Sequence, residues 1–368
     1  MRIAIITLPL NNNIGGILQA WALQTVVGRL GHEVKVIGTH PKLPSLSRCI
    51  RLSCCYTLRK LARRIGGINA LPYRYKMGAT NKFTATHINL TGSRDFSSIK
   101  QEEYGAFVVG SDQIWRSGYN TSDLLPSYLD FTETWNGVRR VAYAASFGVD
   151  KWEYNDEQTA ECARLVKKFD IVTVREDSAV KLCEEHLHVK AHHVLDPTML
   201  MDVKDYERLI AEDETKPGSD IFCYILDENA DKRGVAKYLT KVTGSKTCQI
   251  EGGPLRPYNM FKGNVIQCPT VPQWLRCFKD AKCVITDSFH GSVFSIIFNK
   301  PFVVFQNEGR GNARMESLLR SFDLEERLVD PSDFTKIEEL LHKPLDTAEK
   351  MGRLRALSME ALSTGLGK

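Results

Sequence analysis

The chain has 368 residues and a net charge of +5, with 43% hydrophobic and 25% charged residues. These values are ordinary for a globular protein, and the length suggests about two domains. They exclude a low-complexity chain, and the lack of any run of 18 apolar residues excludes a membrane-spanning helix.

The cysteines and the first residues indicate the compartment. The ten cysteines include no C-x-x-C pair, which argues for free thiols in a reducing compartment and against a zinc cluster or a disulfide framework. Residues 1–7 read as a first strand and lack a signal-peptide cleavage site. We therefore expect a cytoplasmic protein.

The first half of the chain predicts a parallel α/β domain. A strand at 3–7, a helix at 17–30 that ends at Gly31, and a strand at 32–37 make a βαβ unit. Further buried strands are predicted at 106–110, 140–146, 171–175 and 193–196, and a helix at 156–168.

A positively charged segment interrupts this series. Residues 48–82 contain no Asp or Glu, and Leu58, Leu61, Ala62 and Ile65 recur at helical spacing among Arg and Lys. Such an amphipathic stretch favours contact with anionic lipid or a phosphorylated ligand, and the alternative is a solvated helix face beside the core. Nucleic-acid binding is disfavoured because no nucleic-acid motif accompanies the segment.

A polar Pro-Gly stretch at 213–220 predicts a domain boundary. The second series has strands at 221–226, 246–250, 283–286 and one ending at Phe305, and helices at 231–243, 274–278 and 348–362. The predicted fold class is α/β, with two Rossmann-like doubly wound domains that face a cleft. They comprise residues 1–215 and 216–347, and we expect the helix in 348–368 to pack back onto the first domain.

The most informative candidate site follows the strand at 283–286. Asp287, Ser288, His290 and Gly291 come at the carboxyl edge of the sheet, where α/β proteins bind ligands. Histidine exchanges protons near neutral pH, so His290 is a candidate acid or base. The alternative is that Asp287 or Ser288 caps the next helix while His290 packs against it.

Two polar loops of the first domain are further candidates. Gly15 and Gly16 precede a helix, so backbone N–H groups there could approach an anion, although a tight turn needs the same glycines and the pattern is no dinucleotide fingerprint. Asp112 follows a buried strand. It could orient or deprotonate an acceptor hydroxyl, or cap the turn.

Arginines supply candidate anion clamps. Arg175 ends an apolar strand, and its planar guanidinium suits carboxylate and phosphate; an ion pair with Glu176 or Asp177 is the alternative. Arg310 and Arg314 belong to a Gly-flanked loop that could hold an anion or be a solvated surface loop. These residues together indicate an anion-binding α/β enzyme.

Six segments, taken together and in their order, resemble the polysaccharide pyruvyl transferase family. They are residues 8–19 (LPLNNNIGGILQ), 109–115 (VGSDQIW), 142–148 (AYAASFG), 174–178 (VREDS), 194–198 (VLDPT) and 286–292 (TDSFHGS). The match runs from Arg2 to about Leu319. Each motif alone is weak, but their shared order makes the set specific.

The resemblance implies a fold like that of the GT-B glycosyltransferases. It also implies transfer of a pyruvyl group from phosphoenolpyruvate to a sugar as a cyclic ketal, with release of phosphate, during synthesis of capsular or exopolysaccharide or of cell-wall glycans. The acceptor sugar would be carried on a polyprenyl phosphate at the inner face of the plasma membrane, where residues 48–82 would make peripheral contact. Neither a metal nor a cofactor beyond the co-substrate phosphoenolpyruvate is implied.

The resemblance also assigns roles to residues. His290 would be the general acid, Arg175 would grip phosphoenolpyruvate, and Asp112 would be catalytic or orient the acceptor. Some family members carry Arg where this chain has Ser288, so we expect a second anion contact from Arg310 or Arg314. The other expected substrate contacts are Asn13, Gly15, Gly16, Gln19, Ser111, Ser146 and Ser288.

Two other functions fit the same residues. A GT-B glycosyltransferase would use the same cleft for a nucleotide sugar, and stabilisation by phosphoenolpyruvate but not by nucleotide sugars would argue against it. A non-catalytic glycan-binding protein could share the fold, but Asp112 and His290 within the motifs argue against that.

Overall fold

The computed structural model describes residues 1–11, 13–42, 70–214, 219–227, 229–251, 265–267, 269–307 and 311–368, without the side chains of residues 70–77, 251, 265 and 267. Arg310 and most of the predicted basic segment, residues 48–69, lie outside the described residues.

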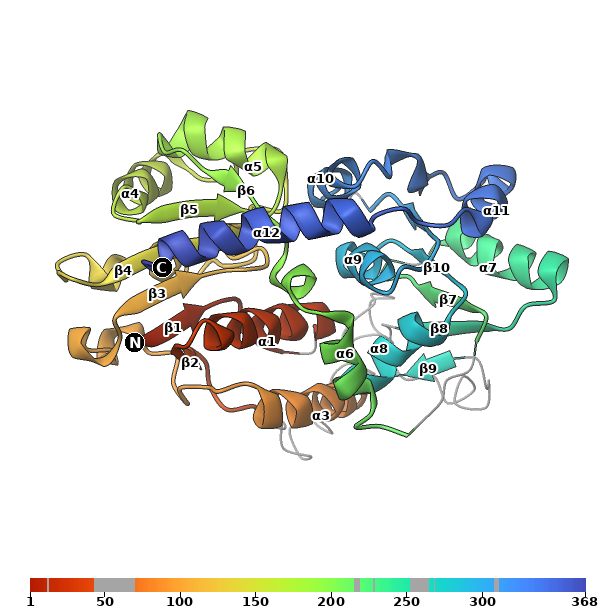
Figure 1. The fold of residues 1–368 in the computed structure, drawn as a ribbon, viewed down its shortest axis with the longest axis horizontal. Coiled ribbons are helices and arrows are strands. Elements are labelled where there is room, and N and C mark those ends of the chain that lie inside the picture. The colour runs from red at the N-terminus through yellow and green to blue at the C-terminus, as the bar shows by residue number, and fades with distance from the viewer. Residues whose placement is uncertain are drawn as a thin grey trace, which may run out of the picture.

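Two parallel six-stranded sheets form the framework, one in each lobe of the molecule (Figure 1). The first has the order β2-β1-β3-β4-β5-β6 and the second β12-β11-β10-β7-β8-β9. The strands of the first sheet are β1 (Arg2–Ile6), β2 (Glu33–Val36), β3 (Ala106–Val109), β4 (Arg139–Ala145), β5 (Ile171–Val174) and β6 (His192–His193). Those of the second are β7 (Ile221–Tyr224), β8 (Thr247–Glu251), β9 (Val265–Gln267), β10 (Cys283–Thr286), β11 (Phe302–Phe305) and β12 (Leu328–Val329).

Helices connect the strands and pack beside the sheets. They are α1 (Ile14–Arg29), α3 (Ala70–His87), α4 (Asp156–Val166), α5 (Asp177–Leu182), α6 (Val203–Ile210), α7 (Ala230–Thr243), α8 (Val271–Asp280), α9 (Phe289–Ile297), α10 (Ala313–Ser321), α11 (Phe334–His342) and α12 (Ala348–Gly365). Central strands such as β3 and β10 are buried along their whole length, as expected for parallel sheets covered on both faces. The predicted α/β class with two parallel sheets is confirmed.

One predicted strand is wrong. Residues 193–196 were expected to form a buried strand, but β6 contains only His192 and His193, and both are exposed at the edge of the sheet. The chain then leaves the sheet because Asp196 accepts a hydrogen bond from the backbone N–H of Thr198 and starts a short 3₁₀ turn with Pro197 in its first position.

The C-terminal helix α12 runs from the second lobe along the first one (Figure 1). It packs on β4, β5 and the 3₁₀ turn at Pro197–Leu200. Leu362 is fully buried there, and Arg139 donates hydrogen bonds to the carbonyls of Thr364 and Gly365. The helix therefore ties the end of the chain to the domain that begins it.

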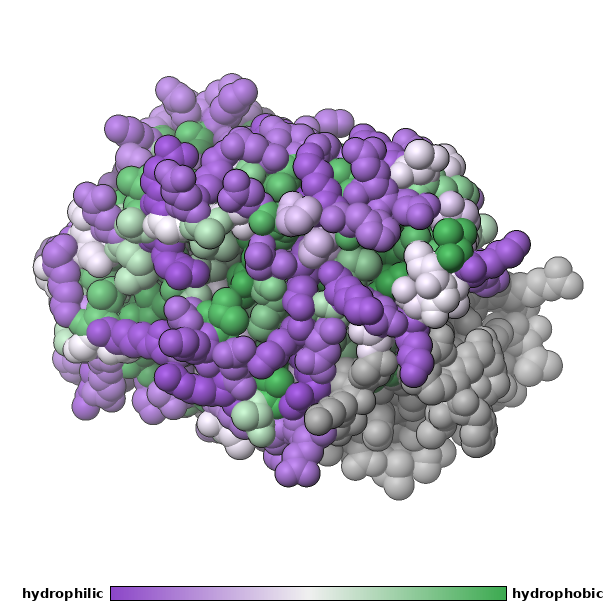
Figure 2. All heavy atoms as spheres, turned by 45° about the vertical axis from the view of Figure 1, so that its right-hand side comes forward, coloured by the Kyte–Doolittle hydropathy of each residue, from purple (hydrophilic) through white to green (hydrophobic). Residues whose placement is uncertain are grey.

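The face shown in Figure 2 is mostly hydrophilic, with hydrophobic residues scattered between polar side chains. Within the described part of the chain, the large hydrophobic side chains exposed to solvent are Met1, Tyr119, Val242 and Leu357. In that part of the chain no helix combines the length and the apolar character needed to cross a membrane.

Two leucines of α12 test its packing. We expect Leu362→Ala to lower the free energy of unfolding by about 2–5 kcal/mol, because it removes a fully buried side chain and leaves a cavity against the first sheet. The matched control is Leu357→Ala in the same helix, where the side chain is 56% exposed and the effect should stay within about 0.5 kcal/mol. Urea denaturation measures both, and equal effects would contradict this packing.

Candidate active site

A cavity of about 340 Å³ lies where the carboxyl ends of both sheets face each other. The first domain contributes Asn13, Ile14, Gly15, Thr80, Asp112 and Gln113 to its wall. The second contributes two kinds of surface. One is polar, with Asp287, Ser288, His290, Asn307, Asn312 and Arg314, and the other is largely apolar, with Tyr224, Leu226, Ile250, Pro269, Trp274, Phe289 and Met315. This mixture of an apolar wall and a few convergent polar groups is typical of a small-molecule site.

Three helices begin at this cavity. The first turn of α1 contributes Ile14 and Gly15, that of α9 contributes Phe289 and His290, and that of α10 contributes Arg314. The first backbone N–H groups of a helix have no partner within the helix and carry the positive end of its dipole. Their convergence makes this region of the cavity favourable for an anion.

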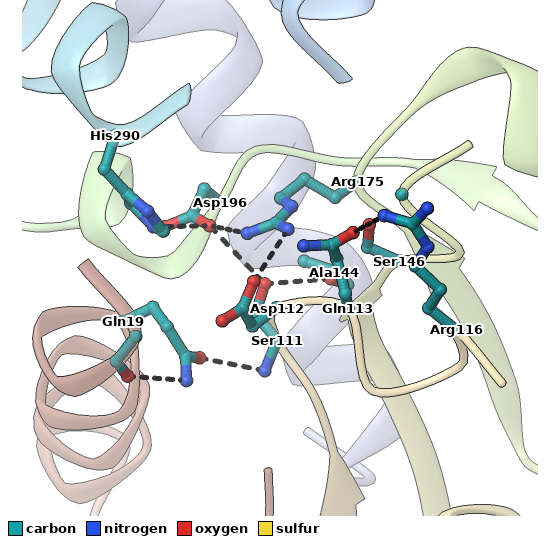
Figure 3. Close-up of polar contacts among 12 residues, drawn as sticks. Gln19, Ser111, Asp112, Gln113, Arg116, Ala144, Ser146, Arg175, Asp196 and His290 are labelled. Carbon is teal, nitrogen blue, oxygen red and sulfur yellow. Dashed lines mark hydrogen bonds and ion pairs between the residues drawn. The ribbon is translucent and has the colours of Figure 1, made fainter. Parts of the chain in front are cut away.

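His290 projects from the first turn of α9 toward the first domain (Figure 3). Ser288 caps the helix by accepting a hydrogen bond from the N–H of Gly291, as the alternative interpretation of the sequence proposed. The imidazole nevertheless lines the cavity, and its side chain is 9% exposed. His290 is therefore a cavity residue from the second domain that reaches the first.

Gly15 makes this approach possible. A Cβ atom added at Gly15 would lie 2.2 Å from Nδ1 of His290, far inside van der Waals contact. At Gly16 an added Cβ would lie 3.0 Å from Nδ2 of Asn13 and 3.3 Å from Oδ2 of Asp112. Gly15 is thus required by the close approach of His290 from the second domain, whereas Gly16 is confined by Asn13 and Asp112 of its own domain.

A buried chain of charged groups lies beneath His290 (Figure 3). Arg175 Nη2 donates to Asp112 Oδ1 at 3.2 Å, and Nη1 donates to Asp196 Oδ2 at 2.8 Å. The same Asp196 Oδ2 lies 3.7 Å from His290 Nε2. The chain joins the loops that follow β3, β5 and β6 to the second domain.

The positive groups keep both carboxylates ionised. Burial by itself would raise the pKa of Asp112, but Arg175, His290 and Arg314 outweigh burial and lower it. Burial likewise opposes ionisation of Asp196, yet His290 and Arg175 hold its pKa well below the usual range for an aspartate. Asp112 is consequently a weak base and a strong hydrogen-bond acceptor.

Arg175 lies beneath the cavity, where it does not form part of the wall. Its side chain is 1% exposed, and its terminal nitrogens hold Asp112 and Asp196. The ion pairs differ from the alternative proposed from sequence, in which Glu176 or Asp177 was the partner. Glu176 instead accepts from Ser146 Oγ and from the N–H groups of the following loop.

Arg314 is the described arginine that lines the cavity. Burial lowers its pKa to about 10, and the neighbouring Arg175 contributes to the same shift. Its guanidinium lies 5.6 Å from the ring centre of Phe289, and that of Arg175 lies 4.5 Å from the same centre. Phe289 therefore contacts two cations, and the face of its ring stabilises them beside α9.

Several residues predicted as substrate contacts support the loops from inside. Gln19 donates to Thr7 Oγ1 at 2.8 Å. It also accepts from the N–H of Ser111 at 2.9 Å (Figure 3). Ser111 Oγ donates to the carbonyl of Ala144, and Ser146 is fully buried. Of the contacts predicted from sequence, the cavity wall includes Asn13, Gly15, Asp112, Ser288, His290 and Arg314, and the buried support includes Gly16, Gln19, Ser111, Ser146 and Arg175.

Two residues at the site have roles that the sequence did not predict; Asp287 was expected at most to cap α9, where Ser288 is the cap instead. Asp287 accepts from the N–H groups of Leu226 and Asp227 and from Lys232 Nζ, so it fixes the loop after β7. Asp196 received no role, although an Asp-Pro-Thr sequence after a predicted strand is a recognisable turn signal. Among the described residues, no group of three His, Cys, Asp or Glu side chains is placed to hold a metal ion.

The model of the polysaccharide pyruvyl transferase family matches residues 13–309, a span that holds the cavity residues from Asn13 to Asn307. The chain belongs to the polysaccharide pyruvyl transferase family. The matched span includes the histidine of the 286–292 segment and the aspartate of the 109–115 segment, and both line the cavity. A comparison with curated proteins gives no match.

Solved structures share the fold of this family member. A UDP-GlcNAc 2-epimerase from Methanocaldococcus jannaschii has a TM-score of 0.53 at 11% identity and covers 100% of this chain and 99% of its own. A UDP-N-acetylglucosamine 2-epimerase from Rickettsia bellii has a TM-score of 0.54 at 7% identity, with coverage of 99% and 96%. At these identities the likeness shows the fold alone, which is of the GT-B type.

Removing Arg175 tests the buried charge chain. We expect Arg175→Met to lower the free energy of unfolding by about 3–5 kcal/mol, because Asp112 and Asp196 would remain buried without their common partner. Arg320→Met is the matched control, because the Arg320–Asp177 pair is exposed and should contribute less than about 1 kcal/mol. Urea denaturation compares them, and a loss at Arg175 no larger than at Arg320 would contradict the buried pairing.

Proposed function

We propose that the protein transfers the pyruvyl group of phosphoenolpyruvate to a sugar of a lipid-linked glycan precursor, forming a cyclic ketal and releasing phosphate. The proposal rests on one observation: His290 lies in the same cavity as three helix N-termini and Arg314. A proton donor and an anion-binding region in one cavity suit a donor that is both anionic and activated by protonation.

The donor would bind at the helix N-termini. Phosphoenolpyruvate carries a phosphate and a carboxylate, and helix N–H groups together with a guanidinium can hold both. Arg314 is the described side chain placed to do so, with Ser288 beside it in the wall. Arg175 would act from below, by keeping Asp112 and Asp196 in place.

His290 would supply the proton. A proton moves from the imidazolium to the methylene carbon of phosphoenolpyruvate, which becomes a methyl group and leaves an oxocarbenium-like centre at C2. One sugar hydroxyl adds to that carbon, the bond to phosphate breaks, and a second hydroxyl closes the ketal. Of the two hydroxyl protons, one restores the imidazolium and the other leaves with phosphate.

Asp112 would orient the acceptor. It lies in the cavity wall as an ionised carboxylate, so it can accept a hydrogen bond from a sugar hydroxyl and direct the oxygen toward the donor. The largely apolar wall with Tyr224 and Trp274 is suited to the less polar face of a sugar ring. An acceptor linked to polyprenyl phosphate would bring the enzyme to the inner face of the plasma membrane during capsular or exopolysaccharide synthesis.

Ligand-induced stabilisation tests the donor. We expect millimolar phosphoenolpyruvate to raise the melting temperature, because a ligand that binds only the folded state at 100 times its Kd stabilises it by about 2.7 kcal/mol. Nucleotide sugars should leave the melting temperature unchanged. With a polyprenyl-linked glycan as acceptor, mass spectrometry should show a gain of one pyruvic acid less one water. Stabilisation by a nucleotide sugar alone would favour a GT-B glycosyltransferase instead.

Two glycines of α1 test the position of the acid. Gly15→Ala should reduce phosphate release from phosphoenolpyruvate and acceptor by about 10²-fold or more, because its Cβ displaces the His290 ring. Gly28→Ala in the same helix should keep wild-type activity, since its Cβ meets no described atom within 4 Å. His290→Gln should behave like Gly15→Ala, and near-normal phosphate release in His290→Gln would refute the role of His290.

A further inference from the structure

Asp196 is a buried carboxylate whose position is fixed on both oxygens. Oδ1 accepts from the N–H of Thr198 at 3.0 Å and from its Oγ1 at 2.7 Å. Oδ2 accepts from Arg175 Nη1 at 2.8 Å, and Ser111 Oγ lies 3.5 Å from the same oxygen. The carboxylate therefore cannot turn without breaking contacts to three different segments.

The second oxygen of this carboxylate also faces His290. Oδ2 lies 3.7 Å from Nε2 of the imidazole, and the Asp196 side chain is fully buried. Thr198 and Arg175 already satisfy a structural role for Asp196, as a turn residue and an ion-pair partner. The approach of the imidazole from the other domain is an additional interaction, and it involves the cavity side chain that exchanges protons near neutral pH.

The opposite side of the ring faces the cavity wall. Nδ1 of His290 is the ring atom nearest to the position of a Cβ at Gly15, which belongs to the first turn of α1. At 3.7 Å the carboxylate is an ion-pair contact of the protonated ring and not a hydrogen bond, and Nε2 has no hydrogen-bond partner among the described residues. A carboxylate on this side favours a proton on Nε2 and orients the ring by charge. Nδ1 then lies against Gly15 at the N-terminus of α1, at the part of the cavity where an anionic donor would bind.

We propose that Asp196 is a positioning residue that holds His290 through Nε2 and thereby directs Nδ1 to the donor. This proposal rests on the proposed function for its catalytic meaning. It gives a role to the 194–198 segment of the first domain. The Asp-Pro-Thr turn in this segment places the Asp196 carboxylate next to His290 of the second domain. Asp196 itself touches neither donor nor acceptor, because it lies beneath the cavity.

The charged groups around the imidazole come from both domains. Asp196 and Asp112 approach from the first domain with Arg175 between them, and Arg314 belongs to α10 of the second. Replacing Asp196 by Asn preserves the size of the side chain and the bond to Thr198, but it removes the negative charge beside both the ring and Arg175. The charged imidazolium loses its nearest counter-ion, so the titration of the ring should change.

Histidine NMR measures this effect without any turnover. In ¹⁵N-labelled full-length protein, the His290 ring signals are identified by their loss in His290→Gln. We expect Asp196→Asn to change the His290 titration and the pattern of protonation between Nδ1 and Nε2, because the charge beside Nε2 is removed. Asp205→Asn is the matched control, because Asp205 is also buried and paired with an arginine, Arg29, but belongs to another cluster. An unchanged titration in Asp196→Asn would overturn the proposal.

Kinetics then connects the ring to the reaction. Asp196→Asn should lower kcat by roughly 10- to 100-fold, as a part of the about 10²–10⁴-fold that a positioned acid contributes, and change KM for phosphoenolpyruvate by less than about threefold. The alkaline limb of the kcat/KM profile should move as well. A larger effect on KM than on kcat, with an unmoved limb, would show a merely structural residue.

A second variant covers the event that Asp196→Asn fails to fold. Asp196→Glu keeps a negative charge beside Arg175, but displaces the carboxylate by one methylene. We expect a titration midpoint near that of the wild type and a kcat reduced by at least about tenfold, and wild-type kcat in Asp196→Glu would overturn the proposal. If the wild type itself does not use phosphoenolpyruvate, the proposed function fails, while the NMR result still decides whether Asp196 holds the ring.

Discussion

The pairing of Arg175 with Asp112 and Asp196 is the interaction on which the arrangement of the cavity depends. These side chains come from the loops after three strands of the first sheet, and each is removed from solvent. Burying a charge is costly unless its partner and its hydrogen bonds are well placed, so the pairs fix the distance between the loops. The same network presents an ionised Asp112 to the cavity and an ionised Asp196 to His290.

The site has a region that suits an anion and a region with two ionised carboxylates, and a third carboxylate in the wall, Asp287, is paired with Lys232. The helix N-termini and Arg314 surround the space where an anion can bind, and the two carboxylates lie on the side of the first domain. His290 stands between these regions, in contact with both. The shared fold with UDP-GlcNAc 2-epimerases at 7–11% identity supplies two sheets and a cavity, but the chemistry is set by these side chains.

The site requires both domains. The candidate acid belongs to α9 of the second domain, and the groups that surround it belong to α1 and to the strand ends of the first. Helix α12 packs on β4 and β5 and so links the C-terminal end of the chain to the first domain. The closeness of Gly15 to the imidazole shows how little space separates the domains at this point.

The sequence alone predicts the two parallel sheets and the residues at their carboxyl ends, because apolar strands, glycine turns and polar strand ends are local patterns. It also identifies His290 and Asp112, since both directly follow a buried strand. It does not reveal that Arg175 lies beneath the cavity, that Gly15 faces His290, or that Asp196 meets the imidazole. Those relations join residues 21 to 275 positions apart, and only the packing of two domains determines them. The predicted strand at 193–196 failed for a related reason, because hydrogen bonds of Asp196 start a turn there instead.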